Sequence, residues 1–528
     1  MLPVRVTFSQ SSPTTSVYDF VEITAEVGFP RAANPFTDAE LSGWFETADG
    51  RTRWQVLGFC DDPDGGRFRI RFTPPAAGEY RYTVEYRQGG ATKSSRGTFR
   101  AIAGRARGPI RVDPAHPWHF VWEGTGEHYF FNGTTAYWLF GWKDDDVITA
   151  SLERLHRLKI NRVRVTIAGR SNVFFGEPIM VHLPWTLYVT PWPATKPEDV
   201  YHPGFDYARF DVAYWQKIER GLRFARDRDM IVSLVLDMND SRVHPAAGSD
   251  DERRFIRYAV ARLAAFSNVT WDLGDDLDGY RDNAWAEATG RLLKQWDPYH
   301  HLTTTHPRTG KASDNQVRQS DWVDFTSFQN WSRTQHAYML EQRGVQRALG
   351  RIIPQTNEEY GYEDHYPLWS PPPDAEAPDV LRRMAWEISM AGGYQTTGET
   401  AKRGTNVWPN TGGGWVNGRG DSTMTMLVGY AHMIDFFTDF DWWSTDPHDE
   451  LVDAGSYCLA DPGRTYAIYL PHASRTTVRL LKGRYRAQWF DPSSGRWSEL
   501  PVVDGGSWTS PVVPDSSHDW AILLRRER

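Results

Sequence analysis

The first hundred residues alternate apolar and polar positions in short segments. Apolar side chains occupy every second position in VEITAEVGF, GRFRIRFTP and GEYRYTVEYR. Such alternation is typical of a strand that buries one face. Sequences rich in Gly, Pro and Asp, such as DDPDGG, supply the turns between the segments. The pattern predicts an all-β sandwich over residues 1–105.

The pattern changes over residues 106–445, where short strands alternate with amphipathic helices. Apolar residues recur at three- and four-residue steps in segments such as DVITASLERLHRLK and DERRFIRYAVARLAAF. The strand candidates are HYFFNGTTAYWL, NRVRVTI, MIVSLVL, NVTWDLG, HLTTTHP, DFTSFQN, RIIPQTN and GGYQTTGE. Eight strands with intervening helices predict a (β/α)8 barrel. A doubly wound open sheet is the alternative, and it is disfavoured because no glycine-rich phosphate loop follows the first strand.

Strand-like alternation returns over residues 446–528. It is clear in RTYAIYLP and DWAILLRRE, and WFDPSSGRW reads as a hairpin turn between aromatic strands. A second, smaller β-sandwich is expected there. The predicted fold class is therefore multidomain, α/β plus all-β, with a central (β/α)8 TIM barrel flanked by N-terminal and C-terminal β-sandwich domains.

Composition narrows the class of protein. The 528 residues include 24 Trp, 23 Tyr and 26 Phe. Some of these rings must be core, and Trp beyond core needs often lines sugar sites, two uses that composition alone does not separate. The net charge of −8 and the absence of a basic stripe argue against a nucleic-acid partner. No apolar run is long enough to span a bilayer, and the N-terminus lacks the pattern of a signal peptide. We therefore expect a soluble, cytoplasmic protein, with homo-oligomerisation left open.

Candidate chemistry lies where two predicted strands end in paired acids. The fourth strand leads into Asp275 and Asp276, and the seventh into Glu358 and Glu359. Extending the strand alternation aims Asp276 and Glu359 into the barrel at the carboxyl ends of the strands, where such barrels carry their active sites. Two facing carboxylates suit glycoside hydrolysis, one as acid and one as nucleophile or base. The plainer alternative is that these acids cap the following helices.

The motifs WDLGDD and EEYG resemble those of retaining (β/α)8 glycoside hydrolases that carry the acid/base after strand four and the nucleophile after strand seven. More narrowly, the chain resembles apiosidase-like bacterial hydrolases with an N-terminal β-sandwich and a small C-terminal β-domain. The resemblance implies that Asp276 is the acid/base and Glu359 the nucleophile. Three positions depart from the clan's pattern. Asp276 stands where clan members usually have Glu, although apiosidase-like proteins often carry Asp there; Asp275 stands where the clan usually has Asn, and Thr134 where relatives often have Asp. Asp275 therefore stays open as an alternative acid.

Other residues are candidates for binding the sugar or supporting the acids. Arg164, on the inward row of the second strand, would lower the pKa of a nearby carboxylate. His306, at the end of the fifth strand, could bond the nucleophile or a sugar hydroxyl, or be a structural histidine. The remaining candidates for substrate binding are Asp275, Glu358, Asp240, Trp138, Trp331 and Trp408. Helix capping is the alternative for Asp240, and core packing for most of the tryptophans.

The sequence contains no zinc signature, because the adjacent His300 and His301 lack a partner motif. No metal or other cofactor is expected. We therefore predict a glycoside hydrolase, retaining and exo-acting on short glycosides or oligosaccharides, with carbohydrate as its substrate. The alternatives are a non-catalytic carbohydrate-binding barrel and a transglycosylase that uses the same residues.

Overall fold

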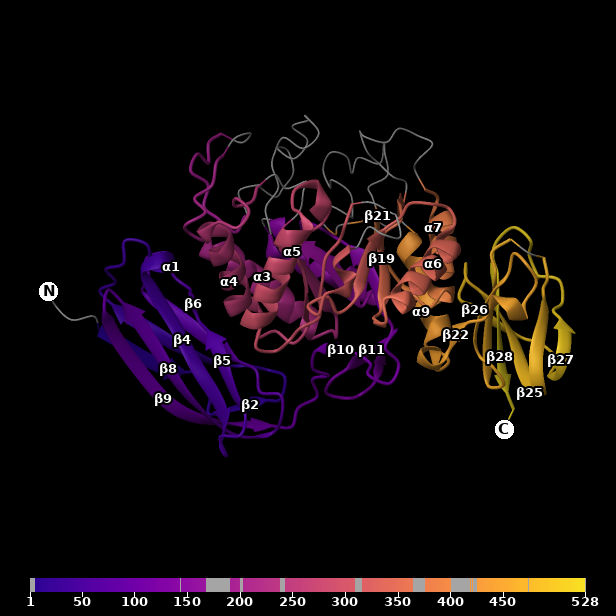
Figure 1. The fold of residues 1–528 in the computed structure, drawn as a ribbon, viewed down its shortest axis with the longest axis horizontal. Helices are drawn as coiled ribbons and strands as arrows, with labels where there is room; N and C mark the ends of the chain where they lie inside the picture. Colours follow the sequence, from indigo (N-terminus) through magenta and orange to yellow (C-terminus); the bar gives the residue numbers. More distant parts are fainter. Residues whose placement is uncertain are drawn as a thin grey trace.

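Three bodies lie along the long axis of the molecule, with a barrel in the middle and a β-domain at each end (Figure 1). The computed structural model describes residues 5–142, 144–167, 190–199, 203–237, 243–308, 316–363, 376–399, 418, 420, 425–472 and 474–527. Within these ranges, no helix is both long and apolar enough to cross a membrane. The predicted fold class is confirmed.

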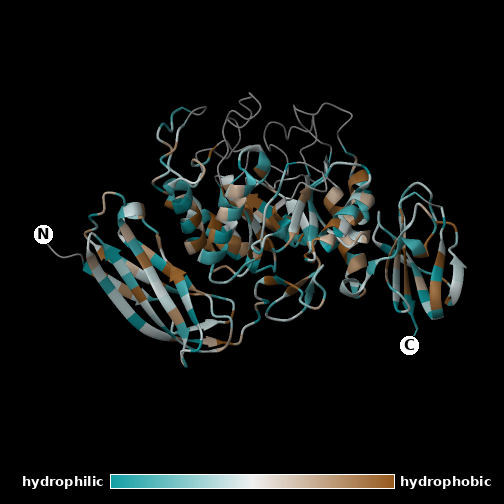
Figure 2. Cartoon of the chain, viewed as in Figure 1, coloured by the Kyte–Doolittle hydropathy of each residue, from teal (hydrophilic) through white to brown (hydrophobic). Residues whose placement is uncertain are grey.

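Two sheets form the N-terminal sandwich. One contains β1 (Arg5–Gln10), β3 (Val21–Gly28), β7 (Arg67–Phe72) and β6 (Phe59–Cys60), and the other β2 (Thr14–Ser16), β9 (Ala91–Ile102), β8 (Gly78–Gln88), β4 (Ala39–Thr47) and β5 (Arg53–Leu57). Hydrophobic and hydrophilic residues alternate along these strands (Figure 2). The apolar rows meet between the sheets, where the rings of Phe45 and Phe72 stack 4.6 Å apart. The short helix α1 (Pro35–Asp38) precedes β4.

Eight parallel strands form the barrel. They are β13 (Asn132–Thr135), β14 (Arg162–Thr166), β15 (Ile231–Val235), β16 (Val269–Asp272), β17 (Thr303–Thr304), β18 (Thr326–Gln329), β19 (Gln355–Glu359) and β21 (Tyr394–Glu399). Each strand from β13 to β16 pairs with the next, β18 pairs with β19, and β21 pairs with both β19 and β13. Between β17 and β18 the backbone amide of Asp324 donates to the carbonyl of Thr303 at 2.9 Å. The short β20 (Tyr362–Glu363) adds to β21.

Amphipathic helices cover the barrel. They are α2 (Asp145–Arg157), α3 (Val212–Arg226), α4 (Asp250–Leu263), α5 (Asn283–Trp296), α6 (Gln335–Ala348), α7 (Pro378–Met390) and α9 (Met426–Phe437). Side chains of Asp144, Asp211, Ser249 and Asp282 cap the first turns of α2 to α5 by accepting backbone N–H groups. Among the described residues between His306 and β18, the only helix is the 3₁₀ helix η6 (Gln316–Gln319), in keeping with the weak helical pattern there.

A buried ion network joins the sandwich to the barrel. Arg71 of β7 donates to both carboxylate oxygens of Glu219 on α3, at 2.8 and 2.9 Å. Arg262 of α4 bonds Asp61 and Glu219, each at 2.5 Å. These side chains are all nearly inaccessible to solvent. Because a buried charge is costly without its partner, the network ties the two bodies together.

A small antiparallel sheet lies under the barrel, and a larger one follows it. The first contains β10 (Ile110–Val112), β11 (Phe120–Trp122) and β12 (His128–Tyr129), and β12 leads directly into β13 (Figure 1). After η7 (Trp442–Ser444), the C-terminal sheet contains β22 (Asp446–Pro447), β23 (Tyr457–Asp461), β24 (Thr465–Leu470), β28 (Trp520–Arg526), β25 (Thr477–Asp491), β26 (Arg496–Glu499) and β27 (Val503–Thr509), with η8 (Asp449–Leu451) between β22 and β23. Long β25 has a bulge between Leu480 and Arg484 and pairs with β26, β27 and β28. Side chains of β23, β24, β25, β27 and β28 form the buried core of this domain.

Candidate active site

The carboxyl ends of β14, β16 and β19 bring an arginine and two acids together inside the barrel. Arg164 of β14 is fully buried, and its Nη2 donates to Oδ1 of Asp275 at 2.9 Å. The same guanidinium bonds Oδ2 of Asp272 at 3.0 Å and the Tyr137 hydroxyl at 3.1 Å. Three polar groups hold the Arg164 guanidinium in one position within this low-dielectric interior. The guanidinium therefore forms a rigid floor at the base of the site.

Asp275 is the carboxylate at the centre of this floor. Its Oδ1 accepts from Arg164, from the Tyr137 hydroxyl at 3.1 Å, and contacts Nδ1 of His306 at 2.5 Å. Burial opposes ionisation, but Arg164 and His306 outweigh it and hold the pKa of Asp275 far below its usual value. Asp275 is therefore a permanent anion at neutral pH.

His306 sits where the sequence placed it, at the end of the fifth strand, and it is fully buried. Its Nδ1 lies 2.5 Å from Oδ1 of Asp275 and 2.7 Å from Nη2 of Arg164. Arginine only donates and a carboxylate only accepts, so Nδ1 donates to Asp275 in one tautomer and accepts from Arg164 in the other. Nε2 has no hydrogen-bond partner among the described residues. In either tautomer it can bond a ligand hydroxyl.

Glu359 ends β19 and is almost completely buried. Its Oε2 lies 3.1 Å from the Tyr137 hydroxyl, and its Oε1 accepts from Nε2 of Gln329 at 2.8 Å. Tyr362 donates a further hydrogen bond. Burial and the anionic Asp275 raise the pKa of Glu359. An oxygen of Glu359, an oxygen of Asp275 and a His306 nitrogen all lie within 4.8 Å of one another.

Adjacent Glu358, which strand alternation would turn away from the interior if Glu359 points inward, also faces the barrel interior. Glu358 is fully buried and pairs with Nη1 of Arg162 at 2.6 Å, while Thr356 donates to its other oxygen at 3.0 Å. Asn357 instead bonds Gln335 of the covering helix α6. The pairing of β18 with β19 shifts register next to Glu358, so Glu359 also reaches the site. Glu358 is therefore the ion-pair partner of Arg162 in the barrel core.

Asp276 does not lie on the strand row from which its direction was predicted. Strand β16 ends at Asp272, and Asp276 adopts a left-handed backbone with φ of 51°, ahead of η5 (Leu277–Gly279). Alternation cannot be extended through such a turn. The side chain of Asp275 enters the interior network, whereas Asp276 is only half-buried. It therefore stands closer to solvent than Asp275 does.

The other candidates fall in different surroundings. Trp138 is buried and packs against Tyr137 at 5.6 Å. Trp331 is 39% exposed, and its ring meets Tyr362 edge-on at 5.5 Å. Thr134, the position that departs from the family pattern, donates to the carbonyl of Thr397 in the barrel wall. Asp240 and Trp408 lie outside the described residues.

Three residues of the site were missed by sequence reasoning: Tyr137, Gln329 and Tyr362. Tyr137 bridges Asp275 and Glu359, although its hydroxyl has only one proton to donate. Its position after GTTA at the first strand, and that of Tyr362 three residues after Glu359, were the available signals. Gln329 had no signal, because its contact depends on the β18–β19 register.

A (β/α)8 barrel with acids at the carboxyl ends of its fourth and seventh strands defines the glycoside hydrolase class. Residues 119–400 match the model of the apiosidase-like catalytic domain, which is more than half of the chain. The protein therefore belongs to the apiosidase-like family and is a glycoside hydrolase. Residues 14–87 match a domain of unknown function, DUF5060.

Solved structures share the fold at low sequence identity. A candidate glycoside hydrolase from Bacteroides vulgatus ATCC 8482 is 21% identical with a TM-score of 0.75, over 97% of this chain and 100% of that one. A glycoside hydrolase family 5 protein from the same organism is 15% identical with a TM-score of 0.62, over 80% and 93% of the two chains. No curated protein sequence matches this chain significantly.

Proposed function

We propose that the protein is a retaining glycosidase in which Glu359 is the nucleophile and Asp276 the acid/base. The observation that carries the proposal is the setting of Glu359: a buried carboxylate at the barrel mouth, oriented by Gln329 and Tyr137. Burial and the Asp275 charge raise its pKa, so the ionised fraction that can attack the sugar grows as pH rises. The hydrogen bonds from Gln329 and Tyr137 also hold the Glu359 carboxylate in one orientation for attack on the anomeric carbon.

The reaction has two balanced steps. Glu359 attacks the anomeric carbon while the glycosidic C–O bond breaks, and Asp276 gives its proton to the leaving oxygen. Ionised Asp276 then takes a proton from water, whose oxygen attacks the anomeric carbon and releases Glu359. Asp276 suits these two proton transfers because it is half-buried and can exchange protons with solvent.

Asp275, the alternative acid, is a poor proton donor. Its pKa is far below the usual range because Arg164 and His306 stabilise the anion against the cost of burial. Its single bonded oxygen already meets three neighbours. We assign it a positioning role: its charge orients Tyr137 and raises the pKa of Glu359, and it favours the positive charge that develops on the sugar ring.

The substrate class is carbohydrate, and we place the action at the end of short glycosides. The floor of the site is closed by Arg164, Asp275 and His306, all of them buried. A closed floor admits a terminal sugar more readily than the middle of a polymer. Detection of internal cleavage alone on long polymers would contradict exo action.

The experiment is hydrolysis of an array of aryl furanosides and pyranosides by wild type, Glu359→Gln and Asp276→Asn. Asp278→Asn is the matched control, because Asp278 is exposed on the same turn and, among the described residues, accepts a hydrogen bond from the backbone N–H of Arg308. We expect the control to keep its activity, and kcat/KM to fall by about 10²–10⁴-fold in Asp276→Asn and at least as far in Glu359→Gln.

Azide rescue and product stereochemistry test the roles. A small anion should restore turnover to Asp276→Asn with a product of retained configuration, and to a Glu359→Ala variant with a product of inverted configuration. Early NMR of the wild-type product should show the anomer of the substrate. Full activity of Asp276→Asn with loss in Asp275→Asn would transfer the acid role to Asp275. Sugar binding without any turnover would leave a carbohydrate-binding barrel.

A further inference from the structure

A second cluster of metal-ligating side chains lies on the opposite side of the barrel from the acids. Asp113 follows β10, His116 lies in the turn after it, and His128 begins β12. These strands form the small sheet under the barrel, and β12 runs into the first barrel strand, β13. The cluster is therefore separate from the site of Asp275 and Glu359.

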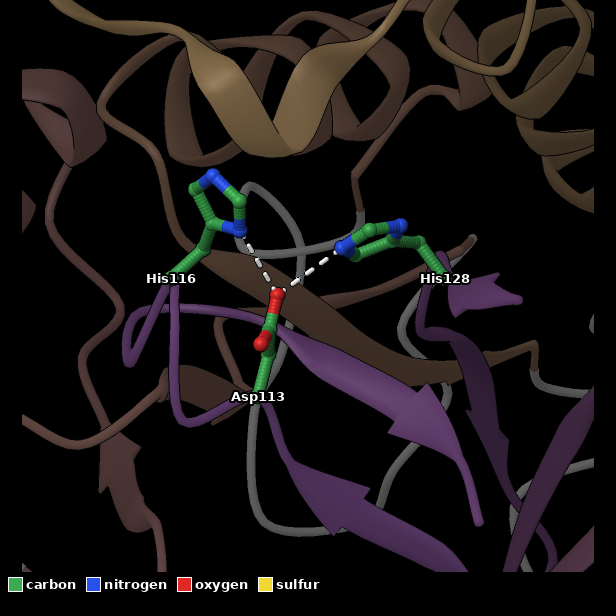
Figure 3. A group of neighbouring side chains, drawn as sticks. All are labelled: Asp113, His116 and His128. Atoms are coloured by element: carbon green, nitrogen blue, oxygen red, sulfur yellow. Dashed lines mark hydrogen bonds and ion pairs between the residues drawn. The ribbon is translucent and has the colours of Figure 1, made fainter. Parts of the chain in front are cut away.

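The two histidines converge on one carboxylate oxygen. Nδ1 of His116 and Nε2 of His128 each lie 2.8 Å from Oδ2 of Asp113 (Figure 3). Each residue thus offers one ligand atom, and the three atoms lie within 4.8 Å of one another. Around a tetrahedral ion with bonds of about 2.0–2.2 Å, ligand atoms stand about 3.3–3.5 Å apart. Small rotations of the side chains would open that space.

The surroundings hold the three side chains ready. The backbone N–H of Ala115 donates to the other oxygen of Asp113 at 2.8 Å, which orients the carboxylate toward the histidines. The ring of His128 stacks on Trp443 of η7 at 3.9 Å with an interplanar angle of 3°. The side chain of His116 is 39% exposed, so solvent can reach the cluster. Ligands fixed by neighbouring groups and an open approach are features of metal sites.

Charge distinguishes this cluster from the similar group in the active site. Asp275, His306 and Glu359 are equally close together, but Nη2 of Arg164 bonds Asp275 and lies 2.7 Å from Nδ1 of His306. A fixed cation there opposes a second one. Within the described part of the chain, Asp113 has no Lys or Arg partner, and its ion pairs are only with His116 and His128.

We propose that Asp113, His116 and His128 bind one divalent transition-metal ion, for which two imidazoles and a carboxylate suit Zn²⁺, with water as the fourth ligand. On binding, the ion displaces the protons of the hydrogen bonds between Asp113 and the two histidines, His116 and His128. The ion would connect the segment before the first barrel strand with the segment that follows α9. His128 belongs to β12, just before β13, and its ring stacks on Trp443, which comes after α9. The bound ion should stabilise the folded enzyme, since only the folded chain assembles the three ligands.

The test is zinc binding by the full-length enzyme, free of any histidine tag and stripped with a chelator. Zn²⁺ bound per chain is measured by competition with a chromogenic chelator, and Tm is measured with and without ZnCl₂. His116→Ala removes an exposed ligand with little risk to the fold. The matched control is His448→Ala, because His448 is also a partly exposed histidine paired with a carboxylate, Glu450, at 2.7 Å. Glu359→Gln tests the rival cluster.

We expect one Zn²⁺ per chain in wild type, His448→Ala and Glu359→Gln, and at least tenfold weaker binding in His116→Ala. Zinc should raise the Tm of the first three but not of His116→Ala. No zinc binding by wild type would overturn the proposal, as would equal binding by wild type and His116→Ala. Loss of the ion in Glu359→Gln alone would also overturn it, by moving the metal to the active site.

Discussion

Arg164 and Asp275 form a fully buried ion pair, with 2.9 Å between Nη2 and Oδ1, at the point where the fourth and second barrel strands end. The pair gives two adjacent aspartates different environments. Arg164 and His306 hold Asp275 as an anion by lowering its pKa, whereas the adjacent Asp276 is half-buried. It also sets the charge felt by Glu359, whose carboxylate shares the Tyr137 hydroxyl with Asp275.

The first prediction concerns Asp275→Asn, which restores the residue usual in the wider clan. Burial and the Asp275 charge both raise the pKa of Glu359, and this variant removes the charge but leaves the burial. The pKa of Glu359 then falls, so a larger fraction is ionised at low pH. We expect the acidic limb of the kcat/KM profile to shift to lower pH, measured with an aryl glycoside. The same limb in Asp278→Asn should not move, and an unmoved limb in Asp275→Asn would contradict the coupling.

The second prediction concerns Trp331, the exposed aromatic beside the site. Its ring meets Tyr362, which itself donates to Glu359. If a sugar stacks on Trp331, Trp331→Ala should raise KM by about tenfold, or about 1.4 kcal/mol of binding, and change kcat by less than about threefold. Trp44→Ala is the matched control, because Trp44 is 37% exposed on the distant sandwich. Equal effects of the two substitutions would argue against stacking.

The third prediction tests the assignment of Glu358 to the barrel core. Glu358→Gln leaves the Arg162 charge buried without its 2.6 Å partner. We expect the free energy of unfolding of the barrel to fall by about 3–5 kcal/mol, measured by urea titration with tryptophan fluorescence. Replacing both residues by Met should recover much of the loss, because no unpaired charge then remains.

The pH dependence of that loss has a definite sign. Burial opposes ionisation of Glu358, but Arg162 and Arg164 lower its pKa below the usual value. A carboxylate with a lowered folded-state pKa stabilises the fold above its unfolded pKa, about 4.3, and that stabilisation disappears as pH falls through the folded-state pKa. The difference between wild type and Glu358→Gln should therefore shrink below about pH 4. A difference that grows on acidification would contradict the ion pair.

The alternation of apolar and polar residues was enough to predict the barrel with its two flanking β-domains, because each period matches one kind of element. Strand ends rich in acid were enough to locate Asp275, Asp276, Glu358 and Glu359 near one another. Arg164 and His306 were found in the same way, since parallel strands deliver their carboxyl ends to one side.

Only the tertiary structure separated the members of each acidic pair. The turn after Asp272 and the register shift next to Glu358 both break strand alternation. Neither break can be recognised from the apolar and polar residues around it in the sequence. Tyr137 joins acids that are 138 and 222 residues away in the sequence, and His128 meets Asp113 across a small sheet. Local periodicity determined which helices and strands form, whereas long-range packing determined which side chains form ion pairs and hydrogen bonds with one another.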